Sequence, residues 1–209
     1  MNRTYTQLAA HLRIKLTDAL PGELAQRKMA STLRTALRLR DKPDNRTRQG
    51  AVCILLYPKL DIWHIPLIVR PEYDGAHSGQ VALPGGRIEE TDADVPAAAL
   101  REMWEEIGVS TEQVEVLGVL TPLFVPASNF MVHPVVAITD VTPVFLPDSR
   151  EVAQILEVPL PELLNESHRA EKEIEVRGVR IHAPFFDLLG QTVWGATAMM
   201  LSEMVEVLR

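Results

Sequence analysis

The sequence predicts an α/β fold in which a mixed β-sheet is sandwiched between helices. Apolar, β-branched runs of strand length recur along the chain, and segments with helical periodicity and helix-capping residues separate them. Strands and helices mixed in this order favour a sheet covered by helices, with an α/β/α arrangement, over an all-β sandwich.

The first 49 residues are expected to form a helical extension and a linker. Residues 4–16 carry leucines at four-residue spacing, which is typical of an amphipathic helix. Pro21-Gly22 then breaks the chain before a second predicted helix over 23–39. The polar stretch 40–49 is interpreted as the linker.

Residues 50–209 are expected to form one larger domain. It opens with a predicted hairpin, because two apolar runs, 51–57 and 62–70, flank the turn-forming residues 58–61. Further strands are predicted near 114–125, 131–141 and 173–183, and helices near 96–107, 161–165 and 192–208.

Composition and charge exclude several classes of function for this chain. The chain has 209 residues, 46% of them hydrophobic, and a formal net charge of −7, which is typical of a globular protein. Residues 51–209 hold 10 Lys and Arg against 24 Asp and Glu, an acidic balance that argues against a nucleic-acid partner. The lone Cys53 excludes an intramolecular disulfide and a Cys-rich zinc site.

The chain also lacks the signals of membrane insertion or secretion. Its longest apolar run is about seven residues, against roughly 20 for a membrane-spanning helix, and charged residues interrupt the N-terminal stretch. We therefore expect a cytoplasmic protein with a small-molecule partner and no membrane partner. A homodimer is compatible with the sequence, but nothing in the sequence requires one.

The residues that point to chemistry lie between Leu83 and Val109. Pro84-Gly85-Gly86 predicts a tight turn whose backbone can come close to an ion or a phosphate. A helix follows, with Asp94 as its expected N-cap and Gly108 as the residue that ends it.

Three carboxylates share one face of that helix, because Glu102, Glu105 and Glu106 are spaced i, i+3 and i+4. Like charges so placed repel, so a cation is expected to compensate them, and hard oxygen ligands favour Mg²⁺ or Mn²⁺ over zinc. The alternative is an acidic face exposed to solvent. The glycine turn and Arg101, which can hold a carboxylate in a bidentate pair, favour the metal site.

Taken in their order along the chain, these residues resemble the sequence motif of the Nudix hydrolase family, the Nudix box. Gly86, Arg101-Glu102-Met103, Glu105-Glu106 and Gly108-Val109 match it. Two departures are an aspartate, Asp92, as the first acid, and eight residues instead of seven between it and Arg101. Both departures, and the segments 67–70 and 77–86 before the box, are similar to the coenzyme A pyrophosphatase branch.

The resemblance implies a Nudix fold and a set of site residues. Glu102, Glu105, Glu106 and the carbonyl of Gly85 or Gly86 would hold the metal, and Arg101 would hold the glutamates in place. The general base stays open between Glu105 and Glu151. Substrate binding is expected from residues on and before the turn: Arg70, His77, Gln80, Gly85 and Gly86.

The same resemblance implies hydrolysis of the pyrophosphate of coenzyme A or its thioesters to 3′,5′-ADP and 4′-phosphopantetheine or its acyl form. Two alternatives keep the fold. One is another substrate, such as ADP-ribose, NADH or a nucleoside triphosphate, because the box addresses only the pyrophosphate. The other is a regulator that binds a nucleotide without cleaving it. Trp104 is interpreted as a core residue, and Trp194 and the Met199-Met200 pair as core or interface residues.

Overall fold

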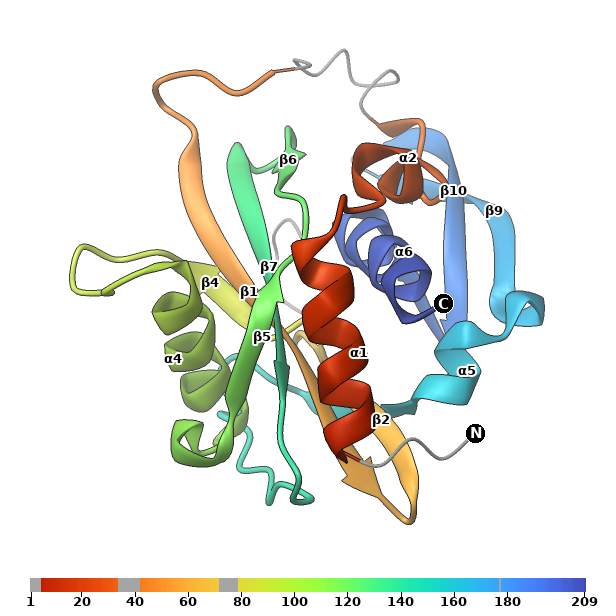
Figure 1. The fold of residues 1–209 in the computed structure, drawn as a ribbon. Helices are drawn as coiled ribbons and strands as arrows, with labels where there is room; N and C mark the ends of the chain where they lie inside the picture. The colour runs from red at the N-terminus through yellow and green to blue at the C-terminus, as the bar shows by residue number, and fades with distance from the viewer. Residues whose placement is uncertain (1–4, 34–41, 72–78, 177) are drawn as a thin grey trace.

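The computed structural model describes residues 5–33, 42–71, 79–176 and 178–209, which form a mixed sheet with helices on both faces (Figure 1). Eight strands make the larger sheet: β1 (Arg48–Lys59), β2 (Ile62–Val69), β3 (Val81–Ala82), β4 (Gly85–Arg87), β5 (Glu115–Val119), β6 (Leu123–Val125), β7 (Phe130–Ile138) and β8 (Gln154–Pro159). A smaller sheet joins β9 (Arg169–Val176), β10 (Val179–Leu188) and β11 (Gln191–Trp194). The expected α/β class is confirmed.

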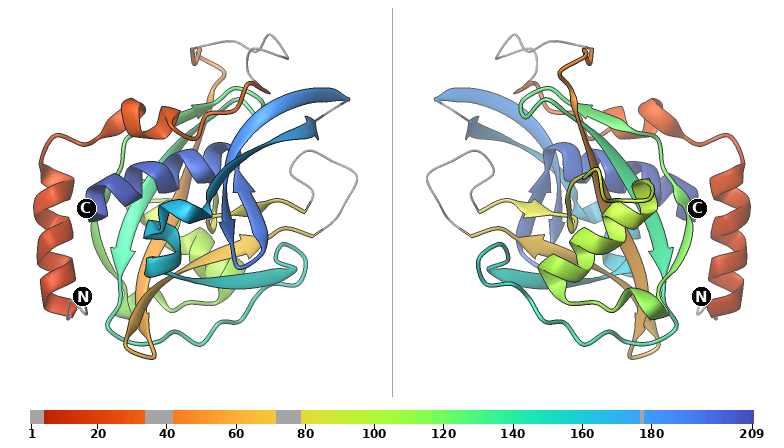
Figure 2. Two further views of the ribbon diagram at one scale, coloured as in Figure 1. Left: turned by 90° about the vertical axis from the view of Figure 1, so that its right-hand side faces the viewer. Right: turned by 90° about the vertical axis from the view of Figure 1, so that its left-hand side faces the viewer.

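Strand β1 organises the larger sheet. It pairs in parallel with β7 and antiparallel with β2 and β4. Because successive side chains point to opposite faces, Cys53 and Leu55 pack beneath α4 (Val95–Ile107), whereas Ile54 and Leu56 enter the larger core. Helices α1 (Tyr5–Thr17) and α6 (Gly195–Leu208) cover that second face (Figure 2). Between β8 and β9 lie the short α5 (Leu160–Leu164) and a single turn at Glu166–His168.

The N-terminal segment contributes to the main core. Leu8 and Leu12 on α1 are buried in the same cluster as the apolar face of α6, and Tyr5 Oη donates a hydrogen bond of 2.6 Å to Glu115 at the start of β5. No helix in the described ranges has the length and apolarity to span a membrane.

The second predicted helix, over 23–39, is wrong in its length. Helix α2 spans Gly22–Arg27, and the chain then leaves the helix to meet β10. Thr32 N donates to the carbonyl of His182 at 3.0 Å, and His182 N donates to Thr32 Oγ1 at 2.9 Å. These tertiary hydrogen bonds prevail over local helix propensity. Residues 34–39 of the prediction lie outside the described residues.

Two predicted strands are also corrected. The segment 114–125 forms two strands, β5 and β6, because the chain leaves the ladder before Pro122, which has no N–H to donate. The segment 173–183 spans a hairpin, with Gly178 at φ +74° in the turn between β9 and β10. The hairpin of β1 and β2 is confirmed.

A buried carboxylate connects α2 to the last helix. Glu203 on α6 is fully buried and accepts hydrogen bonds from Gly22 N at 3.1 Å, Gln26 Nε2 at 2.8 Å and Thr121 N at 3.3 Å. One residue earlier, Ser202 Oγ donates to the carbonyl of Ala25 at 2.8 Å. Helix α2 is thereby held against α6 and the segment that leads into β6.

Candidate active site

Helix α4 begins and ends where the sequence predicts. The Asp94 side chain accepts a hydrogen bond of 2.8 Å from Ala97 N, and Gly108 takes the left-handed conformation at φ +70° while donating to the carbonyl of Trp104. These two caps fix which residues face the sheet. Glu102 and Glu106, one turn apart, are turned toward β4.

The backbone of β4 approaches those two glutamates directly. Gly85 N donates a hydrogen bond of 2.7 Å to Glu106 Oε2. At Gly86, a Cβ atom would collide with the carboxylate of Glu102, so any side chain would displace it. Gly85 has φ +153°, and a Cβ there would overlap the carbonyl oxygen of Ala51. Both glycines are therefore needed for the strand to lie against the acids.

Arg101 gathers the acids of this region around one guanidinium. Its Nε and Nη2 donate to the two carboxylate oxygens of Asp92 at 2.8 and 3.0 Å. Its Nη1 donates to Glu102 at 2.9 Å and to Glu105 at 3.1 Å, and Nη2 also reaches the carbonyl of Arg87 at 3.0 Å. Bidentate, charge-assisted pairs of this kind fix orientation as well as charge.

The two departures from the Nudix box, Asp92 and the longer segment before Arg101, both take part in this arrangement. The longer segment before Arg101 includes a turn in which Asp92 N donates to the carbonyl of Glu89. The Asp92 carboxylate in turn accepts from Glu89 N at 2.8 Å. The hydrogen bonds from Arg101 and from that backbone N–H hold the pKa of Asp92 below its usual value. Asp92 is thus a partner of Arg101, which sequence reasoning had left undecided.

Burial makes the charge of Glu106 costly. Its side chain is 2% exposed, and the nearest cation is Arg70, whose Nη2 lies 3.6 Å from Glu106 Oε1. Desolvation raises the pKa of Glu106 to about 7, reinforced by the charges of Glu102 and Glu151 and opposed by Gly85 N–H and Arg70. Burial also raises the pKa of Glu102, against the effect of Arg101.

Glu151 reaches the site through a loop that packs on the end of α4. Leu146 N donates to the carbonyl of Ile107 at 2.9 Å, and Asp148 N donates to that of Glu106 at 3.0 Å. This brings Glu151 close enough for its negative charge to raise the pKa of both Glu102 and Glu106. No local sequence pattern announces this packing, which is a tertiary contact.

Three further residues predicted to bind substrate, Arg70, His77 and Gln80, precede the glycines of β4 in the sequence. Arg70, directly after β2, borders the acid cluster through its guanidinium, and its backbone N–H donates to the carbonyl of Gln80 at 3.0 Å, which places the backbone of Gln80 beside Arg70. His77 lies outside the described residues.

The expectation that Trp104 is a core residue is wrong, because α4 buries Ala99 and Met103 instead and leaves Trp104 57% exposed.

The described residues do not include three His, Cys, Asp or Glu side chains already converged on one metal position. Arg101 explains this, since its guanidinium binds Glu102, Glu105 and Asp92. The donor set nevertheless fits a hard divalent cation, because it consists of carboxylate oxygens. Burial, the main cause of the raised pKa of Glu102 and of Glu106, leaves these carboxylates poorly solvated, and a divalent cation would compensate their charge.

We predict that Glu106 makes the metal-free protein less stable as the pH rises. The folded pKa of about 7 exceeds the unfolded value of 4.5, so the folded state holds an extra proton between these values and loses its advantage as the pH rises through that window. The loss amounts to roughly 3 kcal/mol. Glu106→Gln should make the free energy of unfolding less dependent on pH. Urea unfolding between pH 4.5 and 8, with a chelator present, measures this dependence.

The control is Glu112→Gln, the same substitution at an exposed glutamate in the turn Thr111–Gln113 that follows α4, which should leave the pH dependence of stability unchanged. A Glu106→Gln curve with the slope of the natural protein would contradict the assignment.

Comparison with known proteins identifies the family. Residues 47–177 match the NUDIX domain family. An uncharacterized Nudix hydrolase NudL of Pectobacterium atrosepticum is 36% identical over 166 residues, which cover 78% of this chain and 84% of that protein. The NudL of Enterobacter sp. (strain 638) is 37% identical over 159 residues, covering 75% of this chain and 81% of that protein.

The fold also matches a solved structure. The crystal structure of RenU, a Nudix hydrolase from M. smegmatis, superposes with a TM-score of 0.56 at 18% identity, covering 77% of this chain and 85% of RenU. At this identity the likeness concerns the fold alone. Together with the family match, it shows that the chain belongs to the Nudix hydrolase family.

Proposed function

We propose that this Nudix hydrolase cleaves the pyrophosphate of coenzyme A or acyl-coenzyme A, giving 3′,5′-ADP and 4′-phosphopantetheine or its acyl form. One observation carries the proposal. The two segments that resemble the coenzyme A pyrophosphatase branch end beside the acids: Arg70 lies 3.6 Å from Glu106, and 77–86 ends on the glycines that touch Glu102 and Glu106. A substrate signature is thereby adjacent to the groups that act on a pyrophosphate.

In this proposal the acids of α4 hold a divalent cation, Mg²⁺ or Mn²⁺. Glu102 and Glu106 are the principal ligands, with Glu105 and the carbonyl of Gly86 as further oxygen donors. Such an ion, when bound, neutralises phosphate charge and lowers the pKa of a bound water. Arg101 keeps the glutamates oriented, and Arg70 binds a phosphate oxygen of the substrate as a planar donor.

Two carboxylates remain candidates for the general base. Glu105 is half-exposed and tied to Arg101 at 3.1 Å, so its position is fixed. Glu151 is exposed and lies near enough to Glu102 and Glu106 for its charge to act on both. We favour Glu105, because a base needs a defined position as well as a suitable pKa.

The substrate prediction is tested by turnover of coenzyme A, ADP-ribose, NADH and dATP with Mg²⁺ or Mn²⁺. Coenzyme A should give the highest kcat/KM. Glu106→Gln should reduce that turnover by at least about a hundredfold while the protein stays folded, since the substitution removes a charged ligand and keeps the acceptor for Gly85 N–H.

Preference for another compound would overturn the coenzyme A assignment and leave the hydrolase intact. Nucleotide binding without turnover of any compound would point to the regulatory alternative.

The base assignment predicts unequal effects of two matched substitutions. Glu105→Gln should lower kcat by about a hundredfold or more, the range of a lost general base, and Glu151→Gln by much less. Steady-state kinetics with saturating metal measures both. The reverse order would assign the base to Glu151.

Three further expectations stay proposals: a small-molecule partner outside the nucleic acids, a cytoplasmic location and a homodimer. The division at residues 49 and 50 is likewise a proposed boundary, although α1 and Met29, which follows α2, belong to the main core.

A further inference from the structure

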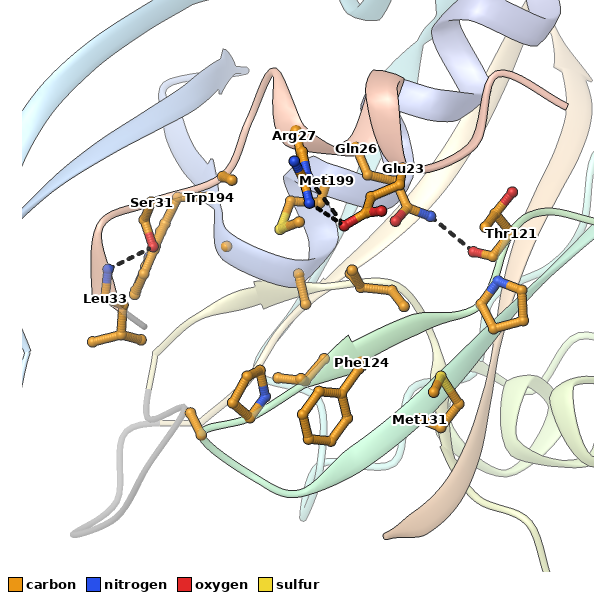
Figure 3. A pocket seen from close by; sticks show the side chains of 18 residues that line it. Glu23, Gln26, Arg27, Ser31, Leu33, Thr121, Phe124, Met131, Trp194 and Met199 are labelled. Carbon is orange, nitrogen blue, oxygen red and sulfur yellow. Dashed lines mark hydrogen bonds and ion pairs between the residues drawn. The ribbon is translucent and has the colours of Figure 1, made fainter. Parts of the chain in front are cut away.

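A pocket lies away from the acids of α4, between α2, β6 and the start of α6 (Figure 3). Its volume is about 360 Å³, within the range of small-molecule sites. Apolar side chains dominate the lining, among them Leu123 and Val125 on β6, Trp194 at the end of β11, and Met199 on α6. Trp194 and Met199, interpreted from the sequence as core or interface residues, therefore border an open space.

The polar side chains on the α2 wall are already engaged with one another. Gln26 Nε2 donates at 2.8 Å both to the carbonyl of Thr121 and to the buried Glu203. Arg27 donates to Glu23 at 2.7 and 3.0 Å, as the dashed lines in Figure 3 show. A phosphate or a nucleobase requires donors and acceptors directed at it, and this wall directs its own elsewhere. The pocket suits an uncharged, apolar group.

Two strands connect the pocket to the acid site. Met131 lines the pocket on β7, and two residues further His133 pairs with Ala51, which pairs with Gly86. Two strand spacings and two residues along a strand separate Met131 from Gly86 by ~12 Å. On the other side, Thr197 Oγ1 on α6 donates to the carbonyl of Val81 on β3, the strand that leads to Gly85.

We propose that this pocket receives the acyl chain of an acyl-coenzyme A substrate, an inference that rests on the proposed function. The pantetheine arm, with its two amide units, extends about 15 Å and can span the distance from the pyrophosphate at the acids to the pocket. Helix α2 then acts as a specificity element, held in place by Glu203 on α6. The chain should prefer acylated coenzyme A over the free thiol.

The first test measures binding without hydrolysis. Octanoyl-pantetheine carries the acyl chain and no pyrophosphate, and its binding can be followed by calorimetry and by tryptophan fluorescence, to which Trp194 in the pocket contributes. It should bind the natural protein, and Ala196→Phe, which adds a ring inside the pocket, should weaken binding by at least about tenfold. Ala10→Phe, on the exposed side of α1, is the matched control and should leave binding unchanged.

The second test compares turnover of free, acetyl- and octanoyl-coenzyme A. In the natural protein the octanoyl ester should have the lowest KM. Ala196→Phe should remove that advantage while free coenzyme A is cleaved as before, and Met199→Ala, which enlarges the pocket, should shift the preference toward longer chains. Thermal melting checks that each variant is folded.

The outcomes separate the two proposals. Octanoyl-pantetheine that fails to bind, or that binds Ala196→Phe as tightly as the natural protein, overturns the pocket assignment whatever the turnover results. Octanoyl-pantetheine that binds as expected, in a protein that does not hydrolyse coenzyme A compounds, overturns the proposed function and keeps the apolar pocket.

Discussion

The close contact between the backbone of β4 and the carboxylates of α4 is the constraint on which the site depends. Gly85 N–H satisfies Glu106 while the backbone of Gly86 lies against Glu102, with no space for a side chain at either position. The caps at Asp94 and Gly108 fix where α4 begins and ends, and the pairing of β4 with β1 fixes the position of Gly85 and Gly86 in the sheet. The fold thus places two carboxylates where their charge is only partly solvated.

Electrostatics then explains why the cluster stays together before any cation binds. Arg101 contacts Asp92, Glu102 and Glu105, and Arg70 faces Glu106. Burial is the main cause of the raised pKa of Glu106, the charges of Glu102 and Glu151 raise it further, and Arg70 opposes both effects. Holding several carboxylates close together lowers the stability of the folded protein, which is typical of sites that bind cations.

Local signals in the sequence predicted the parts of the site that lie on one element. The caps of α4, the spacing of its glutamates and the Pro84-Gly85-Gly86 segment are all readable within about 25 residues. The structure confirms the caps and the close approach of the glycines to the acids, but it places Gly85 and Gly86 in strand β4 and not in a tight turn. The pairing of Arg101 with Asp92 depends on how the longer segment folds back, and the approach of Glu151 depends on a loop packing over α4. Neither leaves a periodic pattern.

The same distinction holds for the fold. Strong apolar runs predicted β1 and β2, whereas α2 ends early because Thr32 pairs with His182, 150 residues away. Trp104 is exposed because α4 packs on the sheet with the face that carries Ala99 and Met103, and Trp104 lies on another face. The pocket assembles from α2, β6 and α6, so the sequence could suggest its residues only as core.

The central claim is that the contact between β4 and α4 creates a binding site for a divalent cation. A titration with Mn²⁺ followed by electron paramagnetic resonance tests it in the natural protein and in Gly86→Ala, whose added methyl displaces the flexible carboxylate of Glu102 and leaves the strand in place. We expect saturable binding by the natural protein and at least about tenfold weaker binding by Gly86→Ala at unchanged melting temperature. Equal affinity in the two proteins, or no binding by either, would contradict it.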